Sequence, residues 1–232
     1  MKVENDKIVE ITEVELYQLW LDRDYCGIIP FYEYKEAFIS TGSKVISADD
    51  TKMKLILISG KAQAGKDTTA NFLKSMLSES GKKVLIIHYA DYLKYICRQF
   101  YDWDGVKDEK GRSLLQNFGN NVRQQNPNFW VDTVINFLNI VKDEFDYAII
   151  PDVRYLNEIE DNRLDNDFGR KITVRVERPG FDNGLTQEQK NHVSETCLDD
   201  YHFDVDIINS GSLNELEAKV KTFVDILNYG NT

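Results

Sequence analysis

The sequence has few cysteines and no long apolar run, and each shortage excludes a class of protein. Its three cysteines, Cys26, Cys97 and Cys197, are scattered and odd in number, so we expect neither a disulfide framework nor a metal-binding spacing. No apolar run approaches the ~20 residues that span a membrane. The acidic first ten residues do not resemble a signal peptide. We therefore expect a protein of the reducing cytoplasm, with no membrane partner.

Basic residues are also scarce relative to acidic ones. The chain carries 28 Lys and Arg against 39 Asp and Glu, a formal net charge of -11. Binding to nucleic acid depends on clustered basic residues, so we expect no nucleic-acid partner. A small anionic ligand remains compatible, because a few local donors can outweigh a distant net charge. The 232 residues suffice for one α/β domain with an appendage.

The first 53 residues differ in pattern from the rest. Residues 12–15 have the form of a capping box and predict a short helix after them, and Phe31 to Ile39 suggest a second helix. Residues 40–52 are polar and are interpreted as a linker. We expect residues 1–53 to be a small helical extension that either docks on the rest of the chain or mediates formation of a homodimer. The apolar residues of its first helix are Val14, Leu16, Leu19 and Trp20.

From Lys54 onward, short apolar runs alternate with longer amphipathic segments. Runs that are apolar on both faces are typical of buried parallel strands. The last amphipathic segment follows a capping box at Ser212 and predicts a C-terminal helix. Residues 54–232 are therefore expected to form one α/β domain, a five-stranded, mainly parallel sheet flanked by helices. The five predicted strands are residues 54–59, 84–87, 147–150, 171–176 and 205–208.

The loop after the first of these strands carries a phosphate-binding pattern, G-x-x-x-x-G-K, from Gly60 to Lys66. Glycines allow the backbone to turn tightly and approach phosphate, and the loop N–H groups and the following helix attract the anion. Lys66 can then reach the β- and γ-phosphates. We expect a P-loop NTPase fold that binds ATP. The predicted binding residues are Gly60, Ala62, Gln63, Ala64, Gly65, Lys66, Asp67 and Thr68.

One position departs from the P-loop pattern. The residue after Lys66, usually Ser or Thr, is Asp67, and Thr68 follows it. Thr68 can face the phosphates, while Asp67 either organises the water around magnesium or caps the helix. Both interpretations of Asp67 stay open.

Eight segments resemble the deoxynucleoside monophosphate kinase family of bacteriophages and bacteria, and more distantly animal-type phosphomevalonate kinase. They occur in the family's order between residues 54 and 225. The resemblance implies an adenylate-kinase-like fold, use of ATP and Mg²⁺, and a nucleotide acceptor. The segments are SGKAQAGKDTTA, YADYLK, LLQNFGNNVR, NFWV, IIPDVR, ERPG, HVSE and INSGSLNEL.

Two charged residues follow the strand at 147–150, where open parallel sheets bind ligands. Asp152 can hold magnesium or its water, and Arg154 can grip a phosphate bidentately. A surface ion pair is the alternative for each. Arg178 is expected to stabilise the transferring phosphoryl group. The predicted catalytic residues are Lys66, Asp152, Arg154 and Arg178, and the predicted metal-binding residues are Asp67, Thr68 and Asp152.

The segment from about 90 to 130 matches the part of nucleoside monophosphate kinases that closes over the acceptor. A polar lid is expected at about 179–200. Ser210 and Gly211 lie where similar folds hold the donor adenine, whereas His192 and Glu195 receive no role. A core position is the alternative for Trp130. The predicted acceptor-binding residues are Lys94, Arg112, Gln116, Arg123, Trp130 and Arg154.

The expected activity is transfer of a phosphoryl group from ATP, with Mg²⁺, to a (deoxy)nucleoside monophosphate. Three alternatives keep the P-loop. They are a kinase of another small phosphorylated metabolite, a non-catalytic nucleotide sensor, and a hydrolase that acts on a partner protein.

Overall fold

A computed structural model describes residues 2–4, 7–12, 16, 19, 31–46 and 52–229. The chain divides into two compact units, Met1–Lys52 and Met53–Thr232. Within the described residues, no helix combines the length and apolarity needed to cross a bilayer.

The first unit contains a three-stranded sheet, which the sequence analysis did not predict. β1 (Lys2–Glu4) pairs antiparallel with β2 (Lys7–Thr12), and β2 pairs parallel with β3 (Lys44–Ile46), in the order β1-β2-β3. The predicted second helix is present as α2 (Phe31–Ser40). The helix predicted at 14–20 lies outside the described residues except for Leu16 and Leu19. The description of this unit as helical is therefore corrected: β1 and β3 have only three residues each, and the parallel partner of β2 lies far along the chain, so they leave little local signal.

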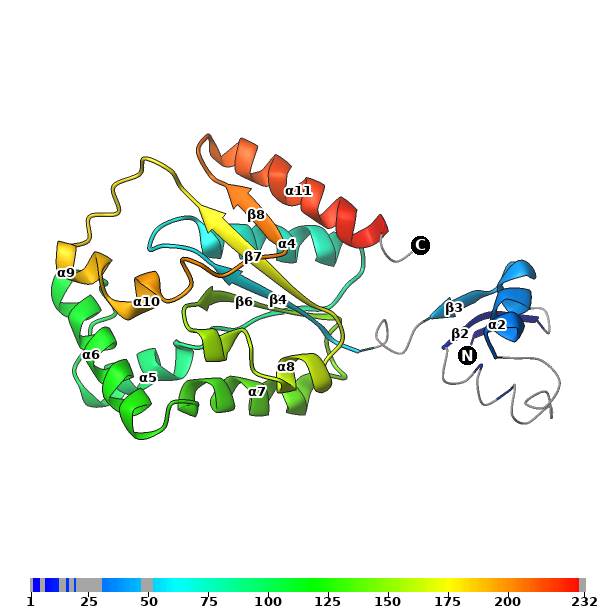
Figure 1. The fold of residues 1–232 in the computed structure, drawn as a ribbon, viewed down its shortest axis with the longest axis horizontal. Helices are drawn as coiled ribbons and strands as arrows, with labels where there is room; N and C mark the ends of the chain where they lie inside the picture. The colour runs from blue at the N-terminus through cyan, green and yellow to red at the C-terminus, as the bar shows by residue number, and fades with distance from the viewer. Residues whose placement is uncertain are drawn as a thin grey trace. The chain divides into compact units, whose positions relative to one another are not determined.

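The second unit is built on a five-stranded sheet in which every neighbouring pair is parallel (Figure 1). The strand order is β5-β6-β4-β7-β8. All five strands coincide with predicted apolar runs, within three residues at each end. They are β4 (Lys54–Ser59), β5 (Val84–Ile86), β6 (Tyr147–Val153), β7 (Lys171–Glu177) and β8 (Val205–Ile208).

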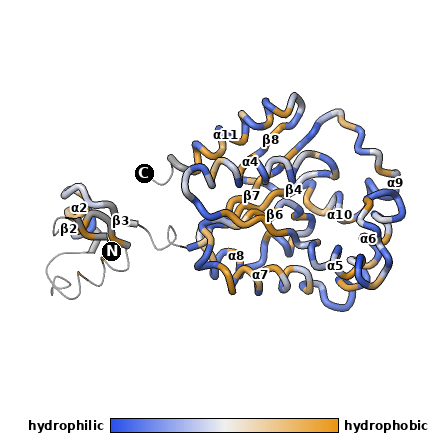
Figure 2. The backbone as a smooth tube through the Cα atoms, turned by 180° about the vertical axis from the view of Figure 1, so that it is seen from behind, coloured by the Kyte–Doolittle hydropathy of each residue, from blue (hydrophilic) through white to orange (hydrophobic). Residues whose placement is uncertain are grey.

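Helices cover both faces of this sheet, as Figure 1 shows. Alternate residues of β4 separate the two layers, because side chains along a strand point to opposite faces. Ile56 and Ile58 pack with α4 (Lys66–Glu79) and α11 (Leu213–Tyr229). Leu55 and Leu57 belong to the other core layer, with α7 (Phe129–Val141) and α8 (Arg163–Asn166). The strands form the apolar centre of the unit (Figure 2), which accounts for their predominantly apolar sequences.

A third apolar cluster joins α5 (Asp91–Phe100) and α6 (Glu109–Gln125) to α7. It is centred on the buried side chains of Leu93, Cys97, Trp103 and Trp130. Three short helical elements complete the unit. They are η2 (Leu156–Glu158), α9 (Gln187–Lys190) and α10 (Val193–Thr196).

The topology gathers four loops at one edge of the sheet. β4 lies at the centre, where the connections turn from one side of the sheet to the other, and ligands bind beyond the carboxyl ends of strands at such a point. Gly60, Asp152, Arg178 and Asn209 all lie at or just beyond the carboxyl end of a strand.

Candidate functional site

The loop between β4 and α4 is shaped by its two glycines. Gly60 has φ +148°, and a Cβ there would lie 2.2 Å from the carbonyl oxygen of Val176 in β7. Gly65 has φ +105°, and a Cβ there would lie 2.6 Å from the side-chain nitrogen of Asn209. Any side chain would displace backbone or a fixed amide, so both positions require glycine. The loop therefore packs tightly between β7 and the turn after β8.

Lys66 lies under this loop and is buried. Its ammonium group donates 2.8 Å hydrogen bonds to the carbonyl oxygens of Gly60 and Lys61. Burial and the nearby charge of Arg154 lower the pKa of Lys66 to about 7. The ammonium group is thus poorly compensated in the protein alone, and a polyphosphate would supply the missing negative charge.

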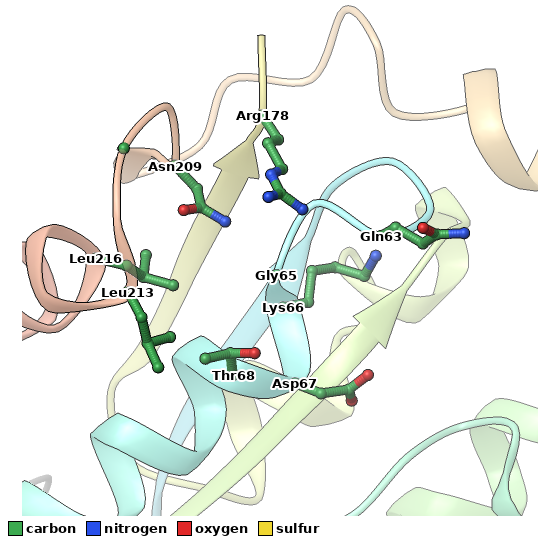
Figure 3. Close-up of a pocket in the computed structure, with 10 residues that line it drawn as sticks. Gln63, Gly65, Lys66, Asp67, Thr68, Arg178, Asn209, Leu213 and Leu216 are labelled. Carbon is green, nitrogen blue, oxygen red and sulfur yellow. The ribbon is translucent and has the colours of Figure 1, made fainter. Parts of the chain in front are cut away.

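A cavity of about 370 Å³ lies against the start of α4 (Figure 3). Arg178 reaches into it from the end of β7, opposite Leu213 and Leu216, which form an apolar wall (Figure 3). The structure brings these predicted residues to the cavity: Gln63, Gly65, Lys66, Asp67, Thr68, Arg178 and Gly211. Gly60, Ala64 and Ser210 do not line it, and Ala62 lines the neighbouring cavity.

That second cavity, of about 350 Å³, lies between the P-loop and helices α5 and α6. Most of its charged lining residues are basic, and Leu93 and Leu115 are among its apolar lining residues. All six predicted acceptor-binding residues meet here, although they come from three helices and the end of β6. They are Lys94, Arg112, Gln116, Arg123, Trp130 and Arg154.

A buried carboxylate orients Arg123 within this cavity. Glu158 accepts a 3.1 Å hydrogen bond from Nη2 of Arg123, and its side chain is 2% exposed. The guanidinium also stacks on the ring of Tyr155, 3.9 Å from its centroid. Burial raises the pKa of Glu158 to about 7, against the opposing charge of Arg123. Arg123 is therefore a fixed cation rather than a solvated one.

Arg154 is held in a similar way by the segment that carries the HVSE motif. Its Nη1 donates to Oε1 of Glu195 at 2.8 Å and to the carbonyl oxygen of Ser194 at 3.2 Å. The side chain of Glu195 is 7% exposed. Arg154 is thus paired with a nearly buried carboxylate and does not form a surface ion pair.

Asp67 does not cap α4, for which Gly65 is the N-cap residue without a side-chain hydrogen bond. One oxygen of Asp67 instead lies 3.0 Å from Nε2 of His88, and Nδ1 of His88 lies 3.2 Å from Asp91. Burial opposes charge on His88, but these two carboxylates outweigh it and raise its pKa to about 9. Asp67 is therefore paired with an imidazolium at neutral pH, an interaction that the sequence did not indicate.

Asp152 fixes the start of the segment that was predicted to bind the acceptor. Its two oxygens accept hydrogen bonds from the backbone N–H groups of Tyr89 and Ala90, at 2.9 and 3.0 Å. Each carboxylate oxygen can accept a second bond. The predicted role of Asp152 in binding a metal thus stays a prediction. Its two hydrogen bonds to the backbone just before α5 are a definite structural role.

Two further predictions have mixed outcomes. Trp130 is buried, and its indole N–H donates a 3.3 Å hydrogen bond to the carbonyl oxygen of Gly119. It therefore has the core position that was the alternative to a role in binding, although it also lines the second cavity. The segment predicted as a lid is packed rather than free-standing, since Leu185 and Leu198 are buried and Gln63 bonds the carbonyl oxygen of Asn183.

Sequence reasoning missed several residues of the site. Asn209 donates a 2.8 Å hydrogen bond to the carbonyl oxygen of Ala64 and steadies the P-loop. His88, Lys107 and Glu158 line the second cavity. Asn209 stood inside the family-like INSGSLNEL segment, so that segment was a usable signal. His88, Lys107 and Glu158 lie in no motif and could be found only from the fold.

The chain is similar in sequence to a family of nucleotide kinases. A family model described as deoxynucleotide monophosphate kinase matches residues 94–220. Two proteins named deoxynucleotide monophosphate kinase, from Escherichia phage RB69 and Enterobacteria phage T4, are each 30% identical, over 94 and 119 residues. These stretches cover 40% and 50% of this chain and 35% and 46% of the relatives. The chain therefore spans only about a third to a half of the curated kinases that it matches.

Longer but weaker likenesses also exist. An uncharacterised protein of Ictalurid herpesvirus 1 (strain Auburn) is 27% identical over 172 residues, 73% of this chain and 69% of that protein. A solved APS kinase from Mycobacterium tuberculosis is 13% identical, with a TM-score of 0.42, and covers 76% of this chain and 98% of its own. A hexameric APS kinase from Thiobacillus denitrificans is 15% identical, with a TM-score of 0.43, over 85% of this chain and 32% of its own.

Proposed function

The chain belongs to the deoxynucleotide monophosphate kinase family, and we propose that it transfers the γ-phosphoryl group of ATP to a (deoxy)nucleoside monophosphate. The observation that carries this proposal is the meeting of the two cavities. Gln63, Lys66 and Asp67 line both of them. A donor in the first cavity and an acceptor in the second would therefore present their phosphates to each other across Lys66.

The lining of the second cavity suits an acceptor that is already anionic. The second pKa of a phosphate monoester is ~6, so its attacking oxygen carries charge at neutral pH and requires no general base. Asp152, at the end of β6, accepts one backbone N–H group at each of its oxygens, which holds the carboxylate in place. The reaction then depends on alignment and positive charge, which Arg123 and Arg154 supply in fixed positions.

The donor's magnesium ion fits the site only as a partner of the phosphates. Among the described residues, no three His, Cys, Asp or Glu side chains come together as a metal site. Mg²⁺ commonly keeps several waters and binds through one or two carboxylates plus substrate phosphates. Asp67 and Thr68, at the first cavity, and Asp152 are the groups that would hold its waters. The ion would neutralise charge that builds up on the phosphates.

Turnover of a panel of nucleoside monophosphates tests the proposal. The full chain is incubated with ATP, Mg²⁺ and each common ribo- and deoxyribonucleoside monophosphate, and diphosphate formation is measured. We expect turnover of at least one of them, well above the ATP hydrolysis seen without acceptor. If none is phosphorylated but another phosphorylated metabolite is, the acceptor assignment is wrong. Hydrolysis without any acceptor effect would favour a hydrolase instead.

A further inference from the structure

We propose that Glu195 is a positioning residue that locks Arg154 against the P-loop, so that the acceptor's anionic group and the donor's phosphates are held in register. This inference rests on the proposed function and assigns a role to the HVSE segment. It concerns how the two cavities are coupled, which neither the motif nor the family match indicates.

The two oxygens of the Glu195 carboxylate serve different parts of the site. Oε1 accepts the 2.8 Å bond from Arg154 at the end of β6. Oε2 accepts a 2.9 Å bond from the backbone N–H of Ala62 in the P-loop. One rigid carboxylate thus fixes the distance between a cation of the acceptor cavity and the backbone that cradles the donor. Its near-complete burial strengthens both bonds, because little water competes for them.

The orientation of Arg154 shows what this contact achieves. Both contacts of its guanidinium, to Glu195 and to the carbonyl oxygen of Ser194, use Nη1. Within the described part of the chain, Nε and Nη2 have no hydrogen-bond partner, and Arg154 lines the acceptor cavity. These two donors form one edge of the planar guanidinium, the edge that can grip an anion bidentately. Glu195 therefore leaves the phosphate-binding edge of Arg154 available.

Neighbouring contacts keep the segment that carries Glu195 in place. The ammonium group of Lys61, also in the P-loop, bonds both the carbonyl oxygen of Glu195 and the carboxylate of Asp199. His192 accepts a bond from the N–H of Ser194 through Nδ1, and its Nε2 lies 2.8 Å from the side-chain amide of Asn120 in α6. The segment thus contacts the P-loop, the end of β6 and the acceptor helix together.

A double-mutant cycle tests whether Glu195 acts through Arg154. Glu195→Gln, Arg154→Ala and the double variant are compared for acceptor KM, ATP KM and kcat. We expect each single change to raise acceptor KM by about tenfold or more, and ATP KM less, because an oriented charge pair is lost. Adding Glu195→Gln to Arg154→Ala should then change acceptor KM little further. Effects that multiply, or an unchanged acceptor KM in Glu195→Gln, would overturn the proposal.

A matched control separates this role from the general loss of an ion pair. Asp165→Asn removes a 2.8 Å ion pair with Lys171, and neither of these two residues lines either of the two cavities. It should leave acceptor KM within about twofold of wild type, since isolated surface pairs contribute little. An equal rise of acceptor KM in this control and in Glu195→Gln would reduce the Glu195 effect to unspecific destabilisation.

A readout without chemistry distinguishes failure of this inference from failure of the proposed function. Amide hydrogen exchange at Ala62 should be faster in Glu195→Ala than in wild type, after correction for global stability. If Glu195→Ala does not fold, Glu195→Met is measured instead, because its side chain is of similar length and has no oxygen to accept the Ala62 N–H. Unchanged exchange would refute the contact. If no monophosphate is a substrate, the proposed function fails, but faster exchange would still support the link between Glu195 and the P-loop.

Discussion

Arg123 and Glu158 form an ion pair of 3.1 Å at the base of the second cavity, in which the carboxylate is buried and the guanidinium faces the cavity. The second oxygen of Glu158 accepts the backbone N–H groups of Arg154 and Tyr155, at 2.6 and 3.1 Å. One carboxylate therefore connects the two arginines that we assign to the acceptor phosphate. Its protonation state should influence both of them.

We expect a pH dependence that Glu158 controls. Burial raises the pKa of Glu158 from 4.5 to about 7, so the carboxyl is neutral below neutral pH and holds Arg123 less firmly. Acceptor kcat/KM should therefore rise as the pH increases through about 7. In Glu158→Gln this step should be absent, while the titration of the acceptor phosphate near ~6 remains. The measurement is a pH profile of kcat/KM for both proteins, and identical profiles would contradict the assignment.

The raised pKa of Glu158 also affects the stability of the fold, and here the effect of increasing pH is unfavourable. The folded state binds the proton of Glu158 more tightly than the unfolded chain, whose carboxyl titrates near 4.5. The contribution of Glu158 to the free energy of unfolding is thus fully present below 4.5 and is lost as the pH rises toward about 7. Denaturant titrations of wild type and Glu158→Gln over this range should show the difference. A contribution that grows with pH would contradict the raised pKa.

Replacing the P-loop lysine should abolish transfer without unfolding the chain. Lys66→Ala removes the ammonium group that would neutralise the donor phosphates, and we expect at least about a hundredfold loss of kcat. Lys74→Ala changes an exposed lysine of the same helix and serves as the control. Turnover and thermal unfolding are measured for both. Near-normal activity in Lys66→Ala would refute the donor assignment.

A glycine packed against a neighbouring strand and a glycine in open space should respond differently to substitution by alanine. Gly60→Ala places a Cβ 2.2 Å from the carbonyl oxygen of Val176, so the P-loop must shift and ATP binding should weaken strongly. Gly81→Ala meets no atom within 4 Å, and only its φ of +79° is strained, at a cost of about 1 kcal/mol. Calorimetric ATP affinity distinguishes them. Equal affinities in the two variants would mean that the tight approach of the loop to β7 is unimportant.

Truncation addresses the first unit, whose role is still only a prediction. A chain that starts at Met53 retains all three apolar clusters of the second unit, so we expect it to fold. If residues 1–52 dock on the kinase unit or mediate dimer formation, the truncated chain should differ from the full chain in turnover or in molecular mass. Light scattering and the monophosphate assay measure both properties. No change in either would exclude both roles.

Local patterns predicted the strands and the P-loop well. Each strand of the second unit is rich in Ile, Leu or Val, and such a segment is legible without knowledge of its partners. The capping box at Ser212 likewise marks the start of α11, where Ser212 and Glu215 exchange hydrogen bonds. The strands β1 to β3 escaped prediction because β1 and β3 are only three residues long and β3 pairs with a segment distant in the chain.

The sequence by itself determined the doubly covered parallel sheet and the phosphate loop, because these depend on periodicity and on fixed spacing over a few residues. Only the tertiary structure decided how the charged side chains of the site are paired. His88 with Asp67, Arg123 with Glu158, and Arg154 with Glu195 join residues that are 21, 35 and 41 positions apart. Such pairs form where the carboxyl ends of strands and the tips of helices converge, and no local pattern encodes that convergence.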